Sequence, residues 1–151
     1  MDAFGRLAGE LTSLMRAMKE LHTRVVEESE HPFEVAGSFV LGRLDVLGPV
    51  RLTQLAQELG LDPSSVSRQV SALERNGLVA KEKDANDQRA QRLLLTDRGR
   101  AAVQALRDAR SRELSQLLPG WTAADLDSLT AALGRLNHDL EAQRERQEIP
   151  A

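Results

Sequence analysis

A run of hydrogen-bonding side chains lies between residues 64 and 69. It contains three serines, an arginine and a glutamine: Ser64, Ser65, Ser67, Arg68 and Gln69. An arginine pairs well with the edge of guanine, a glutamine with adenine, and a serine hydroxyl with either. Serine hydroxyls and the N–H groups at a helix start also bind phosphate oxygens. Presented together on one helix, these residue types would suit contact with DNA.

The neighbouring residues predict that this run begins a helix. Asp62 is a good N-cap residue, and Pro63 fits the first helical position, where its missing N–H is harmless. Val66, Val70 and Leu73 recur at helical spacing and would face inward. A serine-rich helix start can also be a plain solvated surface, because serine caps helices. The elements on either side favour DNA contact.

An amphipathic helix with Thr53 at its N-cap is predicted just before this one. Its leucines form an apolar face. Ala56 lets the two helices cross closely, and Gly60 can take the positive φ of a tight turn. Two helices joined in this way form a helix-turn-helix, whose second helix enters the major groove of DNA. We include Thr53 among the DNA-contacting residues.

A two-stranded ribbon is predicted after the second helix. Asn76-Gly77 would end that helix, residues 78–83 would form one strand, and residues 91–95 the other. A ribbon with a basic tip suits the minor groove or the adjacent backbone, and we expect Arg89 to be the inserted side chain. Asp87 could orient the Arg89 guanidinium through a charged hydrogen bond. An ordinary surface hairpin with a local ion pair is the alternative.

Charge is distributed unevenly along the chain. The net charge of the 151 residues is −3. Residues 63–95 hold six basic and four acidic side chains, a net charge of +2, so the remainder carries −5. Positive charge is thus concentrated where DNA would bind.

Apolar residues repeat at heptad spacing near both ends of the chain. The two seams are Phe4, Leu7, Leu11, Leu14, Met18, Leu21 and Val25, then Leu126, Leu129, Leu133, Leu136 and Leu140. Either seam could belong to a core helix within one molecule. Because both lie outside the winged unit, we expect them to pair with a second copy in a homodimer.

The remaining pattern defines the fold class. Residues 35–47 predict a short helix ending at Gly48-Pro49, and Pro119-Gly120 breaks a long helix after the ribbon. Thr122 is expected to be the N-cap of the last helix. The sequence predicts a mainly α fold with a small β-wing, a winged helix-turn-helix flanked by N- and C-terminal dimerisation helices. We expect residues 1–30 and 100–146 to form the dimerisation region. Residues 34–99 would form the DNA-binding domain, and residues 147–151 a flexible tail.

Several functional classes are disfavoured by composition. The chain has no cysteine, which excludes disulfides, thiolate–zinc sites and thiol redox sensing. It has no apolar run long enough to cross a bilayer and no evident signal peptide, so we expect a cytoplasmic protein without a membrane partner. We find no nucleophile–base pair, Gly-rich phosphate loop or metal triad, and therefore expect no enzymatic activity, no catalytic residue, no cofactor and no metal site.

Residues 52–99 resemble the MarR family of bacterial transcriptional regulators. The resemblance rests on residues 52–56, 62–68, 73–79, 87–89 and 95–99. It implies a homodimer that binds a pseudo-palindromic operator in double-stranded DNA, usually as a repressor, and is often released by a small aromatic or anionic ligand. It also places the family's wing arginine on Arg89 and its aspartate on Asp87. Many members carry a second arginine where this chain has Gln88, a departure that bears on the affinity of the wing for DNA.

The effector and the mode of action stay open. His31 and Arg43 lie where the helices approach the DNA-binding lobe, and could meet an anionic effector. Arg43 could equally be an ordinary surface or ion-paired residue. A winged-helix protein-interaction module without DNA binding, and a regulator that needs no ligand, are the alternative functions.

Overall fold

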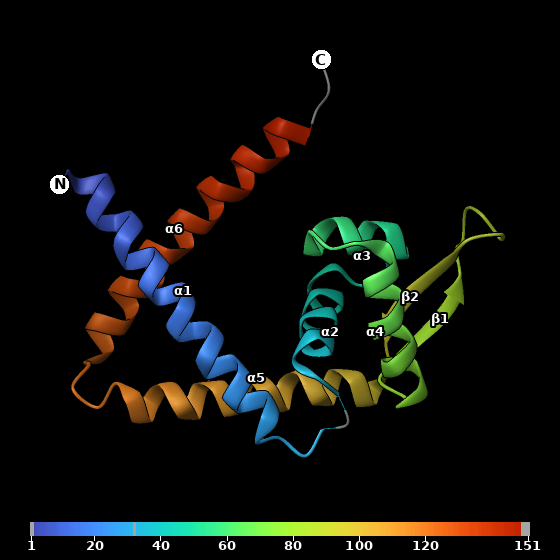
Figure 1. Ribbon diagram of the computed structural model, residues 1–151, viewed down its shortest axis with the longest axis horizontal. Coiled ribbons are helices and arrows are strands. Elements are labelled where there is room, and N and C mark those ends of the chain that lie inside the picture. The colour runs from blue at the N-terminus through green and yellow to red at the C-terminus, as the bar shows by residue number, and fades with distance from the viewer. Residues whose placement is uncertain (1, 32, 149–151) are drawn as a thin grey trace. The chain divides into compact units, whose positions relative to one another are not determined.

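The computed structural model describes residues 2–31 and 33–148, which form six helices and one two-stranded sheet (Figure 1). In chain order they are α1 (Ala3–Glu27), α2 (Val35–Leu47), α3 (Leu52–Leu59), α4 (Pro63–Arg75), β1 (Val79–Lys83), β2 (Gln91–Leu95), α5 (Asp97–Leu117) and α6 (Ala123–Glu148). The mainly α fold with a small β-wing is confirmed.

The chain divides into two compact units, Met1–Glu113 and Leu114–Ala151. The first contains the helix-turn-helix and the sheet, and the second contains the end of α5 and helix α6. Thr122 caps α6 as predicted, because its hydroxyl accepts a hydrogen bond from the N–H of Asp125 at 3.2 Å. Helix α6 continues through the first two residues of the predicted tail, and residues 149–151 lie outside the described part.

An aliphatic core holds the first unit together. It joins α2, α3 and α4 to the sheet and the start of α5, and Leu41 and Leu55 are fully buried in it. The three residues of α4 expected to face inward, Val66, Val70 and Leu73, are all buried. Removal of these side chains from water is the main force that fixes the orientation of α4.

The turn between α3 and α4 forms as predicted. Gly60 has φ 63°, in the left-handed region, and the N–H of Leu61 donates to the carbonyl of Ala56 at 3.0 Å. Asp62 caps α4 by accepting from the N–H groups of Ser64 at 3.1 Å and Ser65 at 3.2 Å.

The N-cap prediction for Thr53 is wrong. Helix α3 begins at Leu52, with Arg51 at the N-cap position, and Thr53 is an exposed residue of the first turn. Val50, just before Arg51, pairs with Leu93 of β2. The extended segment therefore ends next to Arg51, and α3 starts two residues earlier than an N-cap at Thr53 would place it.

The sheet is an antiparallel ribbon in which Val79 pairs with Leu95, and Lys83 with Gln91. Strand β1 starts one residue later than predicted. The N–H of Leu78 donates to the carbonyl of Leu73 at 2.9 Å, so Leu78 still closes the end of α4.

Helix α5 starts in close contact with the turn between α4 and β1. The Thr96 hydroxyl donates to the carbonyl of Gly77 at 2.7 Å and accepts from the N–H of Gly99 at 3.0 Å. A Cβ added to Gly99 would lie 2.1 Å from the carbonyl oxygen of Leu78. Backbone atoms cannot move aside as a flexible side chain can, so only glycine fits at this position.

Buried His22 connects α1 to α2 and α5. Its Nε2 lies 2.7 Å from the Ser38 hydroxyl, and its Nδ1 lies 2.9 Å from the guanidinium of Arg110. Because the Ser38 hydroxyl donates to the carbonyl of Val35 at 2.6 Å, the proton between His22 and Ser38 belongs to Nε2. Nδ1 then accepts from Arg110, which is the neutral form of the imidazole. Burial, and secondly the charge of Arg110, lower the pKa of His22.

Within the described ranges, no helix is long and apolar enough to span a bilayer. The same ranges contain no group of three or more His, Cys, Asp and Glu side chains arranged to hold a metal ion.

We predict that Gly99→Ala destabilises the protein by about 2–3 kcal/mol, because a methyl group forced against backbone strains a packed contact. Urea unfolding followed by circular dichroism would measure the loss. Gly42→Ala is the matched control, since a Cβ at Gly42 in α2 meets nothing within 4 Å. Equal unfolding midpoints for the two variants would contradict the close contact at Gly99.

We also predict a pH-dependent stability that depends on His22. The folded-state pKa of His22 is lowered from 6.5, so the unfolded chain binds the proton more tightly. The stabilising contribution of neutral His22 is complete above pH 6.5 and is lost as the pH falls through the folded-state pKa. Urea unfolding over this range should show the decline in wild type and in His138→Gln, but a weaker one in His22→Gln. An equal slope in all three proteins would refute the role of His22.

Candidate nucleic-acid interface

The exposed face of α4 carries a polar stripe. Because the buried side of the helix faces the core, the opposite side is marked by Ser64, Arg68, Ser71 and Arg75, at steps of four, three and four residues. Both arginines are exposed. In Figure 1 the β1–β2 ribbon extends beside α3 and α4, so the helix and the ribbon can meet one surface together.

The structure distributes the predicted α4 residues over more than one face. Ser64 and Arg68 lie on the stripe, and Ser65 and Ser67 are half-buried at its margins. Gln69 lies toward α2, with its Oε1 3.5 Å from the position that a Cβ on Gly37 would take.

Gln69 also lines a hollow of about 540 Å³ with Phe33 and Glu34, just before α2, and with residues at the C-terminal end of α4. Helical spacing explains this position, because Gln69 is adjacent to the buried side of α4.

Ser71 and Arg75 share the stripe but were not among the predicted contacts. The signal for them was present, since they follow Arg68 by three and seven residues. The predicted contacts on α4 end at Gln69 and so cover only the first half of the helix.

The negatively charged carboxylate of Asp62 already accepts hydrogen bonds from N–H groups at the start of α4. This carboxylate accepts from the N–H groups of Ser64 and Ser65 and from the Ser64 hydroxyl, and these bonds lower the pKa of Asp62, the hydroxyl having the largest effect. A phosphate therefore has to be met by side chains further along the stripe, such as Arg68, and not by these two N–H groups.

The wing loop differs from the prediction in one contact. The Asp87 carboxylate accepts from the backbone N–H of Arg89 at 3.0 Å, and its other oxygen lies 3.9 Å from the guanidinium of Arg51. These two contacts of Asp87 run to the backbone of Arg89 and to Arg51, and neither involves the Arg89 guanidinium. An Asp in a turn readily accepts from the N–H two residues later, and this local bond turns the carboxylate toward the backbone. Arg89 itself is exposed, as is Gln88 next to it.

Three of the six basic side chains of residues 63–95 have hydrogen-bond or ion-pair partners, and one of them is Arg68, which donates to the hydroxyl of Ser65 at 3.4 Å on the same helix. Lys81 pairs with Glu74 at 2.9 Å, which joins β1 to α4, and the Nε of Arg92 donates to the carbonyl of Pro49 at 3.1 Å. The arginines at positions 68, 75 and 89 are exposed, as is Lys83 of β1.

The two candidate effector residues have other neighbours. The Arg43 guanidinium forms an ion pair with Glu58, joining α2 to α3, which is the alternative left open from the sequence. The His31 ring stacks on Phe33 with centroids 5.3 Å apart. The Glu58 contact uses a terminal nitrogen of Arg43, and the Nε of Arg43 is buried without a hydrogen-bond partner among the described residues.

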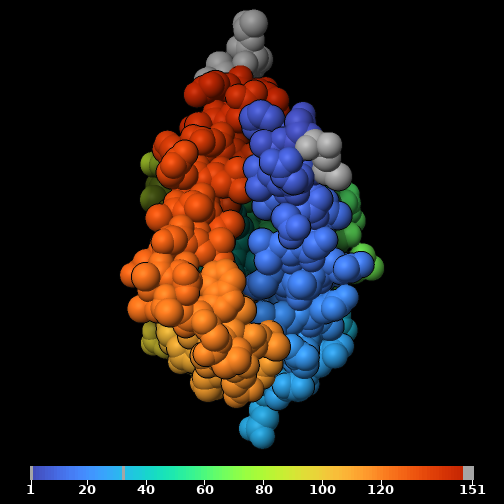
Figure 2. Space-filling model, turned by 90° about the vertical axis from the view of Figure 1, so that its left-hand side faces the viewer, coloured from blue at the N-terminus to red at the C-terminus, as the bar shows by residue number. Residues whose placement is uncertain are grey.

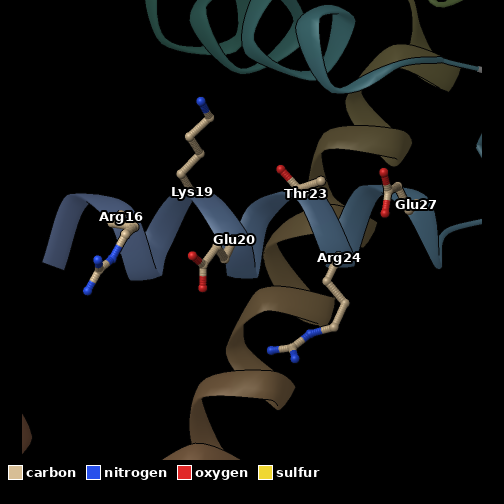
Figure 3. A pocket seen from close by; sticks show the side chains of 6 residues that line it. All are labelled: Arg16, Lys19, Glu20, Thr23, Arg24 and Glu27. Carbon is tan, nitrogen blue, oxygen red and sulfur yellow. The ribbon is translucent and has the colours of Figure 1, made fainter. Parts of the chain in front are cut away.

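A shallow hollow of about 450 Å³ runs along α1. All of its lining residues come from this one helix: Arg16, Lys19, Glu20, Thr23, Arg24 and Glu27. Figure 3 shows Lys19 pointing to one side of the helix and Arg16 and Arg24 to the other. A small ligand needs polar groups that converge, so this hollow is not a built effector site.

These elements define a winged helix-turn-helix protein. Residues 38–90 match the model of the MarR family. Over 128 residues the chain is 29% identical to the uncharacterized HTH-type transcriptional regulator YxaD of Bacillus subtilis (strain 168), covering 85% of this chain and 88% of the relative. The resemblance to the MarR family that was inferred from the sequence is confirmed.

Solved structures share the fold over most of the chain. RV1404 from Mycobacterium tuberculosis matches with a TM-score of 0.78 and 22% identity, covering 92% of this chain and 95% of that one. Streptococcus pneumoniae FabT, solved in complex with DNA, matches with a TM-score of 0.71 and 18% identity, covering 93% of this chain and 99% of that one.

Proposed function

We propose that this chain is a homodimeric transcriptional regulator that binds a pseudo-palindromic operator in double-stranded DNA. The polar stripe on α4 beside the basic wing tip is the observation that carries the proposal. Arg68 and Arg75 suit the major groove, and Arg89 suits the minor groove or the adjacent backbone. FabT, which has the same fold, is solved in complex with DNA, and this supports DNA binding by the chain.

Exposed apolar seams support the homodimer. Helix α6 has 26 residues, of which none with a described side chain is buried, and Leu126, Leu129 and Leu140 are 43%, 41% and 60% exposed. In the heptad seam of α1, Leu21 is buried but Phe4 is 81% exposed. Figure 2 shows the N-terminal part of α1, in dark blue, lying open on the surface. A partner that covered these seams would remove large apolar surfaces from water.

The proposal includes repression that a small aromatic or anionic molecule relieves, as the family resemblance implies. The ion pair between Arg43 and Glu58 argues for an effector that makes its main contacts elsewhere. If transcription from the operator depended only on the concentration of this protein, the alternative of a regulator that needs no ligand would be favoured.

The decisive experiment selects DNA with the full chain. Duplexes with a random central region are bound, recovered and sequenced through several rounds. We expect enrichment of an inverted repeat whose half-sites lie about one helical turn apart. A failure to enrich any sequence, together with recovery of a protein partner, would favour the protein-interaction module.

We predict that Arg75→Ala and Arg89→Ala each weaken binding to the selected duplex about tenfold, or about 1.4 kcal/mol, because each removes a charged contact with DNA. Fluorescence anisotropy at several salt concentrations would measure both the affinity and its salt dependence. Arg146→Ala, in the last turn of α6, is the matched loss of one positive charge and should bind as wild type does. Unchanged affinity in both test variants would refute the interface.

We predict that Leu129→Glu converts the homodimer to a monomer, because it buries a charge in the seam of α6. Analytical ultracentrifugation at micromolar concentration would show the change in mass. Ala131→Glu places the same charge on the opposite side of the helix and should leave the dimer intact. A dimeric Leu129→Glu protein would show that another surface forms the interface.

A further inference from the structure

Three consecutive residues before α3 fasten the wing to the helical lobe. The carbonyl of Pro49 accepts from the Nε of Arg92 at 3.1 Å. Val50 exchanges two backbone hydrogen bonds with Leu93, at 3.1 and 2.7 Å. These contacts fix the base of the ribbon but do not reach the loop at its tip.

Arg51 extends this attachment to the loop. Its Nε donates to Asp84 Oδ2 at 3.0 Å, and its terminal nitrogen lies 3.9 Å from Asp87 Oδ2. The Asp84 side chain is only 11% exposed, whereas most ion pairs on a protein surface are well solvated. Arg51 therefore joins the start of α3 to both carboxylates of the wing loop.

Asp84 also organises the loop itself. Its Oδ1 accepts from the N–H groups of Asn86 at 2.9 Å and Asp87 at 3.3 Å. Its own N–H donates to the carbonyl of Ala90 at 3.0 Å, closing the loop around Arg89. The hydrogen bonds to Asn86 and Arg51 hold the pKa of Asp84 below its usual range, so the carboxylate is charged when it meets Arg51.

We propose that Arg51 is a positioning residue that, through Asp84, sets the direction in which the wing presents Arg89 to DNA. The inference rests on the proposed DNA binding. The planar fork of an arginine can address two carboxylates at once, which fixes an angle as well as a distance.

The first test measures the wing without DNA. Amide hydrogen exchange of the full chain should be about tenfold faster at Asn86, Asp87 and Arg89 in Arg51→Gln, while the amides of α4 keep their wild-type rates. Arg24→Gln is the matched control, because it also removes a positive charge and an ion pair, with Glu113 at 3.5 Å. Unchanged exchange in the wing would overturn the proposal.

The second test separates positioning from charge. Asp84→Asn removes a negative charge near DNA, so electrostatics alone predicts tighter binding to the selected duplex. Positioning predicts the opposite, a loss of about tenfold, with a similar loss in Arg51→Gln. Tighter binding by Asp84→Asn would overturn the proposal.

A charge swap completes the design. Arg51→Asp combined with Asp84→Arg should recover wing protection relative to either single variant, because the ion pair is restored in reverse. Single and double variants that exchange equally fast would count against the pair. If wild type enriches no DNA, the proposed function fails, and the exchange experiments still decide whether Arg51 holds the wing.

Discussion

The burial of one side of α4 is the constraint on which the rest of the interface depends. Val66, Val70 and Leu73 pack into the core formed with α2 and α3. Once these three are inside, helical geometry leaves no choice about which residues face solvent. The same burial that stabilises the unit therefore selects Arg68 and Arg75 for the surface and turns Gln69 toward α2. The rotation of α4 about its axis thus determines both which residues pack in the core and which residues form the candidate interface.

The strands of the wing are anchored by the burial of Val79, Leu93 and Leu95, whereas the wing loop is oriented by polar contacts. Its loop has few apolar atoms, so backbone pairing at Val50 and the carboxylate of Asp84 define its position. Hydrogen bonds depend on direction, so they can fix the angle of the wing loop relative to the helices. A hydrophobic contact would fix only the distance between them. The arginine at the tip stays solvated until a partner arrives.

The sequence predicted the elements better than the contacts between them. Helix periodicity, the Asp62 cap and the turn at Gly60 are local signals, and the structure agrees with all three. The start of α3 was missed because it depends on pairing between Val50 and Leu93, which are far apart in the chain. The partners of Asp84 and Asp87 were missed for the same reason, since Arg51 precedes them by more than thirty residues. Gln69 was predicted to contact DNA from its chemical type. Its position on the helix turns it toward α2 instead.

Helix α6 has a consequence for how the protein would respond to its own abundance. A helix in which none of the described side chains is buried gains little stability from its own chain, so its folding is coupled to association in the proposed dimer. The amount of dimer at low concentration rises with the square of the monomer concentration. Occupancy of an operator would then rise more steeply than the protein level itself. Small changes in synthesis or degradation would be converted into larger changes in transcription.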